Sequence, residues 1–107
     1  MPRESLQTLS EPMYYVLLSL TTNLCGTEIM KEVERISNGR VRIGPGTLYT
    51  MLAKFLDNGL VEQPYYENRK RIYKITTHGK RILKEEYERL KRMTDDGSSI
   101  VETLMRF

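Results

Sequence analysis

The stretch Ile43–Val61, "IGPGTLYTMLAKFLDNGLV", sets a proline between two glycines directly before a dense helical pattern, and it ends that pattern at Asn58-Gly59. Pro45 suits the first turn of a helix, and Gly59 suits the left-handed residue that follows a helix end. Apolar residues recur at helical spacing along one face: Leu48, Met51, Leu52, Phe55 and Leu56. The stretch therefore predicts an amphipathic helix with sharp ends.

The other face of this predicted helix carries hydroxyl groups and a single cation. Its members are Thr47, Thr50 and Lys54, with Tyr49 at the margin. Such side chains contact phosphates and base edges, and the threonines are short enough to let a helix approach a groove closely. Gly46 leaves the helix start open, so free backbone amides can meet a phosphate. The alternative is that these are plain exposed residues of a surface helix.

Two further helices are predicted on the N-terminal side. Ser10 before "EPMYYVLLSL" is typical of an N-cap, and the helix that follows runs to about Leu20 or Thr22. "TEIMKEVERIS" then predicts a one-sided helix that Asn38-Gly39 ends. Its apolar face consists of Ile29, Met30, Val33 and Ile36.

On the C-terminal side, "LVEQPYY" and "KRIYKIT", joined by "ENR", predict a two-stranded hairpin. Thr77 is expected to cap a last helix that begins near His78. The order helix, helix, helix, hairpin, helix predicts a winged helix-turn-helix, a mainly α fold with a small β-hairpin (α+β). We expect a DNA-binding domain over residues 1–77 and a dimerisation helix over residues 78–107.

The positive charge is concentrated in the middle of the chain. Residues 40–76 contain seven basic and three acidic side chains, an excess of four on a chain whose net charge is +3. Five of the basic residues flank the central helix: Arg40, Arg42, Arg69, Lys70 and Arg71. Strand alternation is expected to send Arg69 and Arg71 to one face of the hairpin and Lys70 to the other. A local basic patch favours a polyanionic partner, and the alternative is a solvated face without one.

The last helix carries a heptad pattern that advances by four and three residues. Its members are Leu83, Tyr87, Leu90, Thr94, Gly97, Val101 and Leu104. If the helix is continuous, it overhangs its own domain, and the apolar seam requires a second copy of the chain. The alternative is a break over residues 95–98, where "DDGS" disfavours a helix.

The segment "GPGTLYTMLAKFLDNGLVE" resembles the signature of PadR-type transcriptional regulators. The resemblance extends back through "GTEIMKEVERISNGRVRI" and forward through "RIYKITTHGKRIL", over residues 13–92. It implies a homodimeric winged-helix repressor that binds a two-fold symmetric site in double-stranded DNA and releases it when a small molecule binds. It also implies that Thr47 and Tyr49 contact the DNA backbone or base edges, that Lys54 contacts a phosphate, and that the wing enters the neighbouring groove.

The sequence departs from that signature at several positions. Gly44 stands where serine is usual and Thr50 where a second proline is usual, and Cys25 and Thr27 occupy positions where histidine and tyrosine are common. The chain has no tryptophan, so the paired indole rings of the multidrug-binding branch are missing. The identity of an effector, and the residues that would bind it, are therefore not transferable.

Several other classes of protein are disfavoured. No nucleophile–base arrangement or pair of carboxylates indicates an enzyme, and the single cysteine and single histidine indicate neither a metal site nor a cofactor. The apolar run Tyr14–Leu18 is too short to span a membrane, and the first residues lack the apolar region of a secretory signal, so we expect a cytoplasmic protein. The remaining alternative is a winged-helix module that binds another protein without binding specific DNA. Neither the operator sequence nor the regulated gene follows from the residues.

Overall fold

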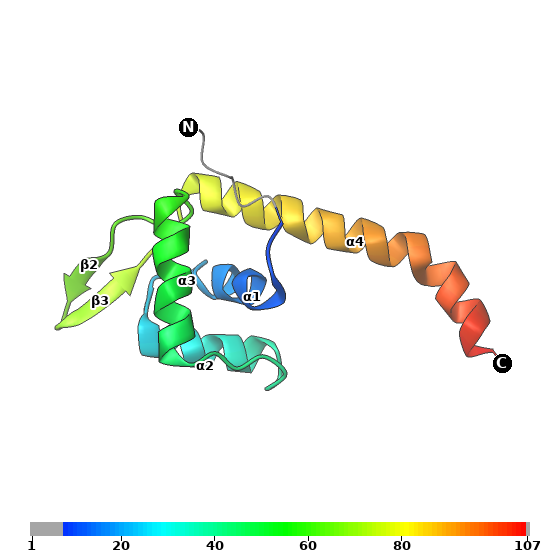
Figure 1. The fold of residues 1–107 in the computed structure, drawn as a ribbon, viewed down its shortest axis with the longest axis horizontal. Coiled ribbons are helices and arrows are strands. Elements are labelled where there is room, and N and C mark those ends of the chain that lie inside the picture. The colour runs from blue at the N-terminus through cyan, green and yellow to red at the C-terminus, as the bar shows by residue number, and fades with distance from the viewer. Residues whose placement is uncertain (1–7, 107) are drawn as a thin grey trace.

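The computed structural model describes residues 8–106 and confirms the winged helix-turn-helix (Figure 1). The elements in chain order are α1 (Glu11–Ser19), β1 (Leu24–Cys25), α2 (Gly26–Ile36), α3 (Pro45–Asp57), β2 (Tyr65–Glu67), β3 (Lys70–Tyr73) and α4 (Thr77–Met105). Residues 1–7, in which no secretory signal is expected, and Phe107 lie outside the described residues. Of the helices in the described part, none is long and apolar enough to cross a membrane.

The helix ends lie close to where the punctuating residues predict them. The Ser10 hydroxyl accepts a hydrogen bond from the backbone N–H of Met13 at 3.3 Å, as an N-cap does. Gly59 has φ +75°, a left-handed conformation that suits glycine because it has no Cβ. The prediction for the last cap is wrong by one residue, since the cap is Thr76 rather than Thr77. Its Oγ1 accepts from the N–H of Gly79 at 2.9 Å, and the helix already begins at Thr77.

The sheet has three antiparallel strands in the order β1-β3-β2, rather than the two strands predicted for a hairpin. The additional strand, β1, lies directly before α2 and pairs Cys25 with Ile72. The other edge of β3 pairs with β2, and there Tyr65 lies opposite Ile72. The wing is thereby attached to the start of α2, which fixes the hairpin relative to the helix-turn-helix.

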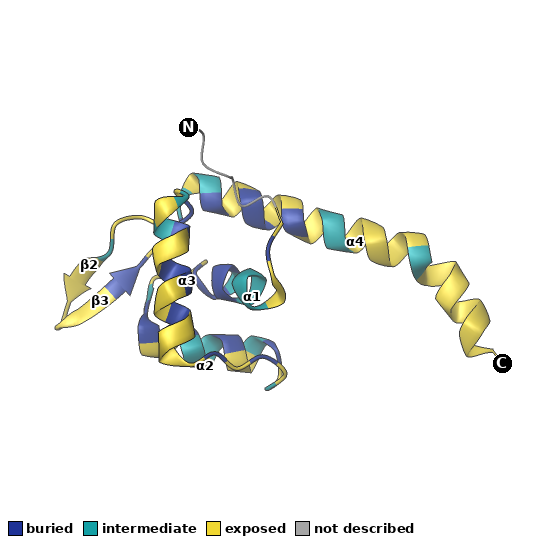
Figure 2. Cartoon of the chain, viewed as in Figure 1, coloured by how far each residue is buried: buried dark blue, intermediate teal, exposed yellow. Residues whose placement is uncertain are grey.

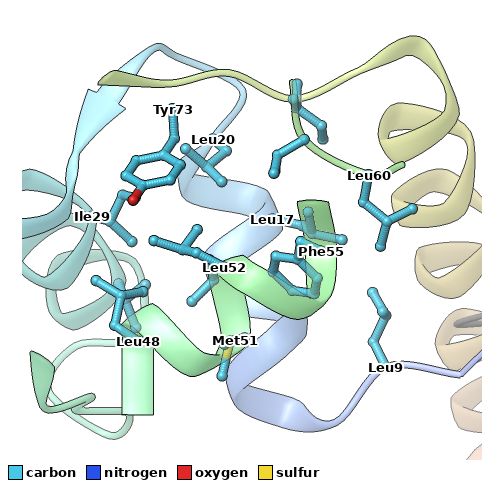
Figure 3. Packing of buried hydrophobic residues seen from close by; sticks show 14 of the residues in the cluster. Leu9, Leu17, Leu20, Ile29, Leu48, Met51, Leu52, Phe55, Leu60 and Tyr73 are labelled. Carbon is cyan, nitrogen blue, oxygen red and sulfur yellow. The ribbon is translucent and has the colours of Figure 1, made fainter. Parts of the chain in front are cut away.

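The buried face of α3 is the centre of the hydrophobic core, as its spacing predicts. Phe55 is fully buried, and it lies among Leu17 of α1, Leu52 of α3 and Leu60 of the segment after α3 (Figure 3). Leu56, predicted on the same face, is only partly buried. This anchoring on one side leaves the other side of α3 at the surface.

Helix α4 is continuous over 29 residues, so the predicted alternative of a break at residues 95–98 is wrong. Its first turns pack on the core through Ile82 and Leu83, and Leu83 is therefore buried within its own protomer rather than offered to a second copy. The distal half of α4 extends away from the body with almost every residue exposed (Figure 2). This protruding helix makes the molecule elongated, with extents of 56 × 36 × 21 Å.

Glu86 joins α4 to the segment before α1. The residue is only 2% exposed, and its carboxylate accepts hydrogen bonds from the Arg89 guanidinium at 2.8 Å and from the Leu9 backbone N–H at 3.3 Å. The bonds from Arg89 are the main cause, and that from Leu9 a further one, of a pKa of Glu86 below its ordinary value, while burial opposes them. The charged form of Glu86 is therefore the one that the fold stabilises.

Replacing Glu86 should change how stability depends on pH. Because the folded pKa is depressed, the stabilisation is present above the unfolded value of 4.5 and is lost as pH falls through the folded pKa. We expect Glu86→Gln to unfold about 1–2 kcal/mol more easily near neutral pH. It should also lose less stability than the wild type on acidification. Urea titrations across this pH range check both statements, with the exposed neighbour Glu85→Gln as the control. Parallel acid curves for wild type and Glu86→Gln would contradict the assignment.

Candidate nucleic-acid interface

The start of α3 lacks the stabilising groups found at the other helix starts. Its N-cap is Gly44, without a side-chain cap, Pro45 follows, and the first turn contains no acidic residue. By contrast, hydroxyls cap α1 and α4, and Glu28 accepts from the Cys25 backbone N–H at the start of α2. A Cβ added at Gly46 would meet nothing within 4 Å. The N-terminal amides of α3 thus lie at an open, uncharged surface that suits an anion.

The exposed face of α3 contains the polar residues expected from the sequence. Thr47, Thr50 and Lys54 are exposed, and Tyr49 is 47% exposed. An open surface hollow of about 660 Å³ joins most of this face to α1, and its lining residues are Met13, Gly46, Thr47, Thr50, Met51 and Lys54. The Thr50 hydroxyl donates to the Gly46 carbonyl at 3.0 Å, so its oxygen remains available to accept a hydrogen bond.

The tip of the wing differs from the predicted alternation. Asn68 and Arg69 both have positive φ, 50° and 64°, as the two central residues of a tight hairpin turn require. Arg69 is therefore a turn residue, and the prediction that it shares a strand face with Arg71 does not apply. On β3, Arg71 lies opposite Tyr66 of β2, and Lys70 lies opposite Glu67.

Tyr49 and two wing cations lie around the start of α2. A hollow of about 180 Å³ is lined by Cys25, Gly26, Thr27, Tyr49, Lys70 and Arg71. The Arg71 guanidinium also lies 5.8 Å from the ring centroid of Tyr73, which is within cation–π range. Burial raises the pKa of Tyr73, so its phenol stays protonated at neutral pH. The wing and the exposed face of α3 thus meet at one surface.

Arg40 and Arg42, which precede α3, are held by other parts of the chain. Arg40 donates to the Tyr15 hydroxyl at 2.9 Å and pairs with Glu11 at 3.2 Å. Arg42 lies 3.4 Å from the Glu34 carboxylate. Both side chains are exposed, and exposed ion pairs are weak, so they can exchange these partners for phosphates at little cost.

The six remaining members of the predicted seam lie in the exposed or half-exposed part of α4, with Val101 50% and Leu104 67% exposed. The sequence pattern missed three further exposed apolar residues of this helix: Met93, Ile100 and Met105. Met93 and Ile100 could have been found from the sequence, because Met93, Gly97, Ile100 and Leu104 also advance by four and three residues. The apolar surface of α4 is therefore broader than the heptad predicts.

A third hollow, of about 270 Å³, lies where α4 leaves the body. It is lined by Leu9, Ser10, Glu11, Tyr14, Tyr15, Glu86, Arg89 and Leu90. Tyr14 and Tyr15 pack edge to face with their ring centroids 5.8 Å apart. Among residues 8–106 there is no cluster of histidine, cysteine, aspartate or glutamate that could hold a metal ion.

Comparisons with known proteins agree with this geometry. The family model described as "Transcriptional regulator PadR-like family" matches residues 16–85. A transcriptional regulator from Clostridium thermocellum has 25% identity and a TM-score of 0.69, covering 84% of this chain and 88% of its own. No curated protein matches the sequence significantly.

Two more distant structures share the fold. A PadR family transcription regulator from Clostridium difficile has 18% identity and a TM-score of 0.73, covering 86% of this chain and 99% of its own. F93 from STIV, a winged-helix DNA-binding protein, has 18% identity and a TM-score of 0.67, covering 75% of this chain and 87% of its own.

Proposed function

Because the chain belongs to the PadR-like family of transcriptional regulators, we propose that it is a homodimeric, cytoplasmic repressor that binds a two-fold symmetric DNA operator. The family consists of regulators rather than enzymes. In this proposal residues 1–77 bind DNA, and within residues 78–107 the exposed part of the helix pairs two copies of the chain. The DNA-contacting set is Arg40, Arg42, Gly46, Thr47, Tyr49, Thr50, Lys54, Arg69, Lys70 and Arg71.

The uncapped, exposed start of α3 is the observation that carries this proposal. Its amides, the hydroxyls of Thr47 and Thr50 and the Lys54 cation form one polar face, on the side opposite the buried Phe55. A helix of this kind places its N-terminal residues on base edges in the major groove. The hairpin projects beside α3 (Figure 1). Its strand β3 carries the cations Lys70 and Arg71.

A footprint on the operator tests the two-fold arrangement. Two recognition helices related by a dyad should protect half-sites centred about 34 Å apart, one turn of the duplex. Candidate operators come from selection of random duplexes on the purified protein. A single unpaired half-site in every selected sequence would contradict the dimeric repressor.

A salt titration separates DNA binding from the alternative of a protein-interaction module. If each protomer neutralises about four phosphates, log K should fall with log[salt] with a slope of about −7. We expect this slope on the selected operator, and weaker, equally salt-dependent binding to random duplex. Absence of duplex binding even at low salt would favour the interaction module.

Two substitutions on α3 should separate phosphate contact from base reading. Lys54→Ala is expected to weaken binding to all DNA sequences about equally and to reduce the slope of log K against log[salt] by roughly one unit per lost contact. Thr50→Ala is expected to reduce the binding free energy on the operator by about 1–3 kcal/mol and to relax the base preference at one position. Because the Thr50 hydroxyl already donates to Gly46, we expect it to accept from the exocyclic amine of adenine or cytosine. Equal losses on operator and random DNA for Thr50→Ala would remove it from base reading.

Release of DNA by a small molecule is part of the proposal, and the cavity between α1 and α4 supports it. That cavity combines two tyrosines with the Glu86–Arg89 pair at the place where α4 leaves the winged body. A compound bound there could change the angle of α4, and with it the separation of the two recognition helices. A screen for compounds that raise the melting temperature and lower operator affinity tests this step.

A further inference from the structure

Tyr49 does more in this fold than present a hydroxyl to solvent. Its phenol lies against Gly26, the first residue of α2. A Cβ built on Gly26 would overlap the Tyr49 Oη and would lie 2.9 Å from its Cζ. The second helix of the helix-turn-helix therefore contacts the first through a side chain that occupies the space a Cβ at position 26 would take.

The backbone at Gly26 gives no other reason for a glycine. Its φ is not in the left-handed region, in contrast to Gly39 and Gly59. Alanine adopts such a conformation, and it is the better residue in a helix. Without Tyr49, an alanine at position 26 should therefore stabilise the protein. The glycine leaves room for the phenol in the position that it occupies here.

The position of the phenol connects three elements that the proposed function uses together. Tyr49 projects from the first turns of α3, Gly26 begins α2, and Lys70 and Arg71 of β3 line the same hollow. Since Gly26 follows Cys25 of β1, which pairs with β3, the start of α2 is also tied to the wing. The ring thus lies at the junction that sets where α3 stands relative to the wing.

We propose that Tyr49, seated on Gly26, is a positioning residue that fixes α3 relative to α2 and the wing, so that the α3 face and the wing cations meet one duplex in register. The inference rests on the proposed DNA binding. It predicts that filling position 26 displaces the phenol from its seat on α2, loosens the position of α3 and weakens operator binding, although every side chain of the proposed DNA-contacting set is still present. A phenol that acts only as a direct phosphate contact would also be displaced by an alanine at position 26, so Tyr49→Phe, which keeps the ring and removes the hydroxyl, separates the two roles. A positioning ring should keep operator affinity in Tyr49→Phe, whereas a phosphate contact should lose it.

A double-mutant cycle tests the proposal with Gly26→Ala, Tyr49→Leu and the combination. We expect Gly26→Ala to weaken operator binding by about tenfold or more, the size of a lost base contact, with an unchanged salt slope. In the Tyr49→Leu background, the same Gly26→Ala change should alter affinity by less than about twofold, because the two residues are not independent. The melting temperature should fall for Gly26→Ala alone and should rise when it is added to Tyr49→Leu.

Gly79→Ala is the matched control for a glycine with a purely structural role. A Cβ there would overlap the Leu60 carbonyl oxygen and would lie 2.7 Å from the Ile75 Cγ1, and Tyr49 is not among its nearest neighbours. Its cost in melting temperature should be the same with Tyr49 or Leu at position 49.

The possible outcomes distinguish the two proposals. Tight wild-type binding with an equal loss for Gly26→Ala in both backgrounds would overturn the positioning role and leave the repressor intact. A wild type that binds no duplex would overturn the repressor and the positioning role for DNA together. The coupled affinity and melting cycles, with an additive Gly79→Ala and with operator affinity retained in Tyr49→Phe, would support the positioning role.

Discussion

Replacing both Val101 and Leu104 with aspartate is expected to give a folded, helical protomer that no longer pairs and that binds its operator about a hundredfold more weakly or worse. Both side chains lie on the distal half of α4, which packs on no other part of the described chain, and they are 50% and 67% exposed. Burying each in a dimer would contribute about 1.5–3 kcal/mol, and a two-fold axis counts each residue twice. Charges at this seam should therefore remove several kcal/mol from association.

The loss of DNA affinity follows from the loss of pairing. A lone protomer meets one half-site, and it lacks the second, tethered contact that raises the affinity of a dimer. Sedimentation velocity gives the oligomeric state, circular dichroism gives the helix content, and anisotropy gives operator binding. Ser99→Asp/Thr103→Asp is the matched control, because it adds the same charge to exposed residues on the opposite face of α4. An unchanged dimer for Val101→Asp/Leu104→Asp would contradict the proposed seam.

Thr47→Asp is expected to abolish operator binding while leaving the fold as stable as before or slightly more so. Thr47 is exposed in the first turn of α3, where no acidic residue and no side-chain cap is present. A carboxylate there interacts favourably with the helix dipole, by about 0.3–1 kcal/mol. Against a DNA phosphate about 4–6 Å away it is repelled by about 3–4 kcal/mol per half-site, a loss of two to three powers of ten. Stability and function should thus change in opposite directions.

Unfolding in urea and binding by anisotropy at low salt check the two halves of this expectation. Lys84→Gln lowers the net charge by the same one unit at an exposed position of α4, and it should keep most of the affinity. Thr47→Ala should fall between the two, since it removes a hydroxyl without adding a charge. Binding by Thr47→Asp within about threefold of wild type would remove the start of α3 from the DNA interface.

The sequence predicted the helices of the winged domain well because their ends depend on local chemistry. Pro45 marks the start of α3 because its ring fixes φ, and Gly59 marks the end because a residue without a Cβ adopts the left-handed conformation. Neither preference depends on the rest of the chain. Strand β1 escaped prediction because two residues, Leu24 and Cys25, carry no periodicity. It exists only because β3 offers an edge to it.

The same distinction between local and distant causes applies to the candidate site. Which residues of α3 face outward follows from the 3.6-residue period, and the exposed hydroxyls and lysine are where that period places them. Arg69 adopts φ 64° because a two-residue turn imposes it, which overrides the residue's own preference. The contact between Tyr49 and Gly26 joins residues 23 positions apart and depends on how α2 and α3 cross. No local pattern encodes such a distance.

The continuity of α4 has a mechanical consequence for the proposed dimer. From Leu90 to Met105 the unbroken helix spans about 22 Å at ~1.5 Å per residue. A tilt of only about 5° at its base displaces the far end by about 2 Å, and a dyad doubles this to about 4 Å, more than the ~3.4 Å rise of one base pair. So small a tilt would therefore move the two recognition helices out of register with successive major grooves of the duplex. In the proposed dimer, the angle at the base of this continuous arm would thus determine which operator spacing the two recognition helices fit.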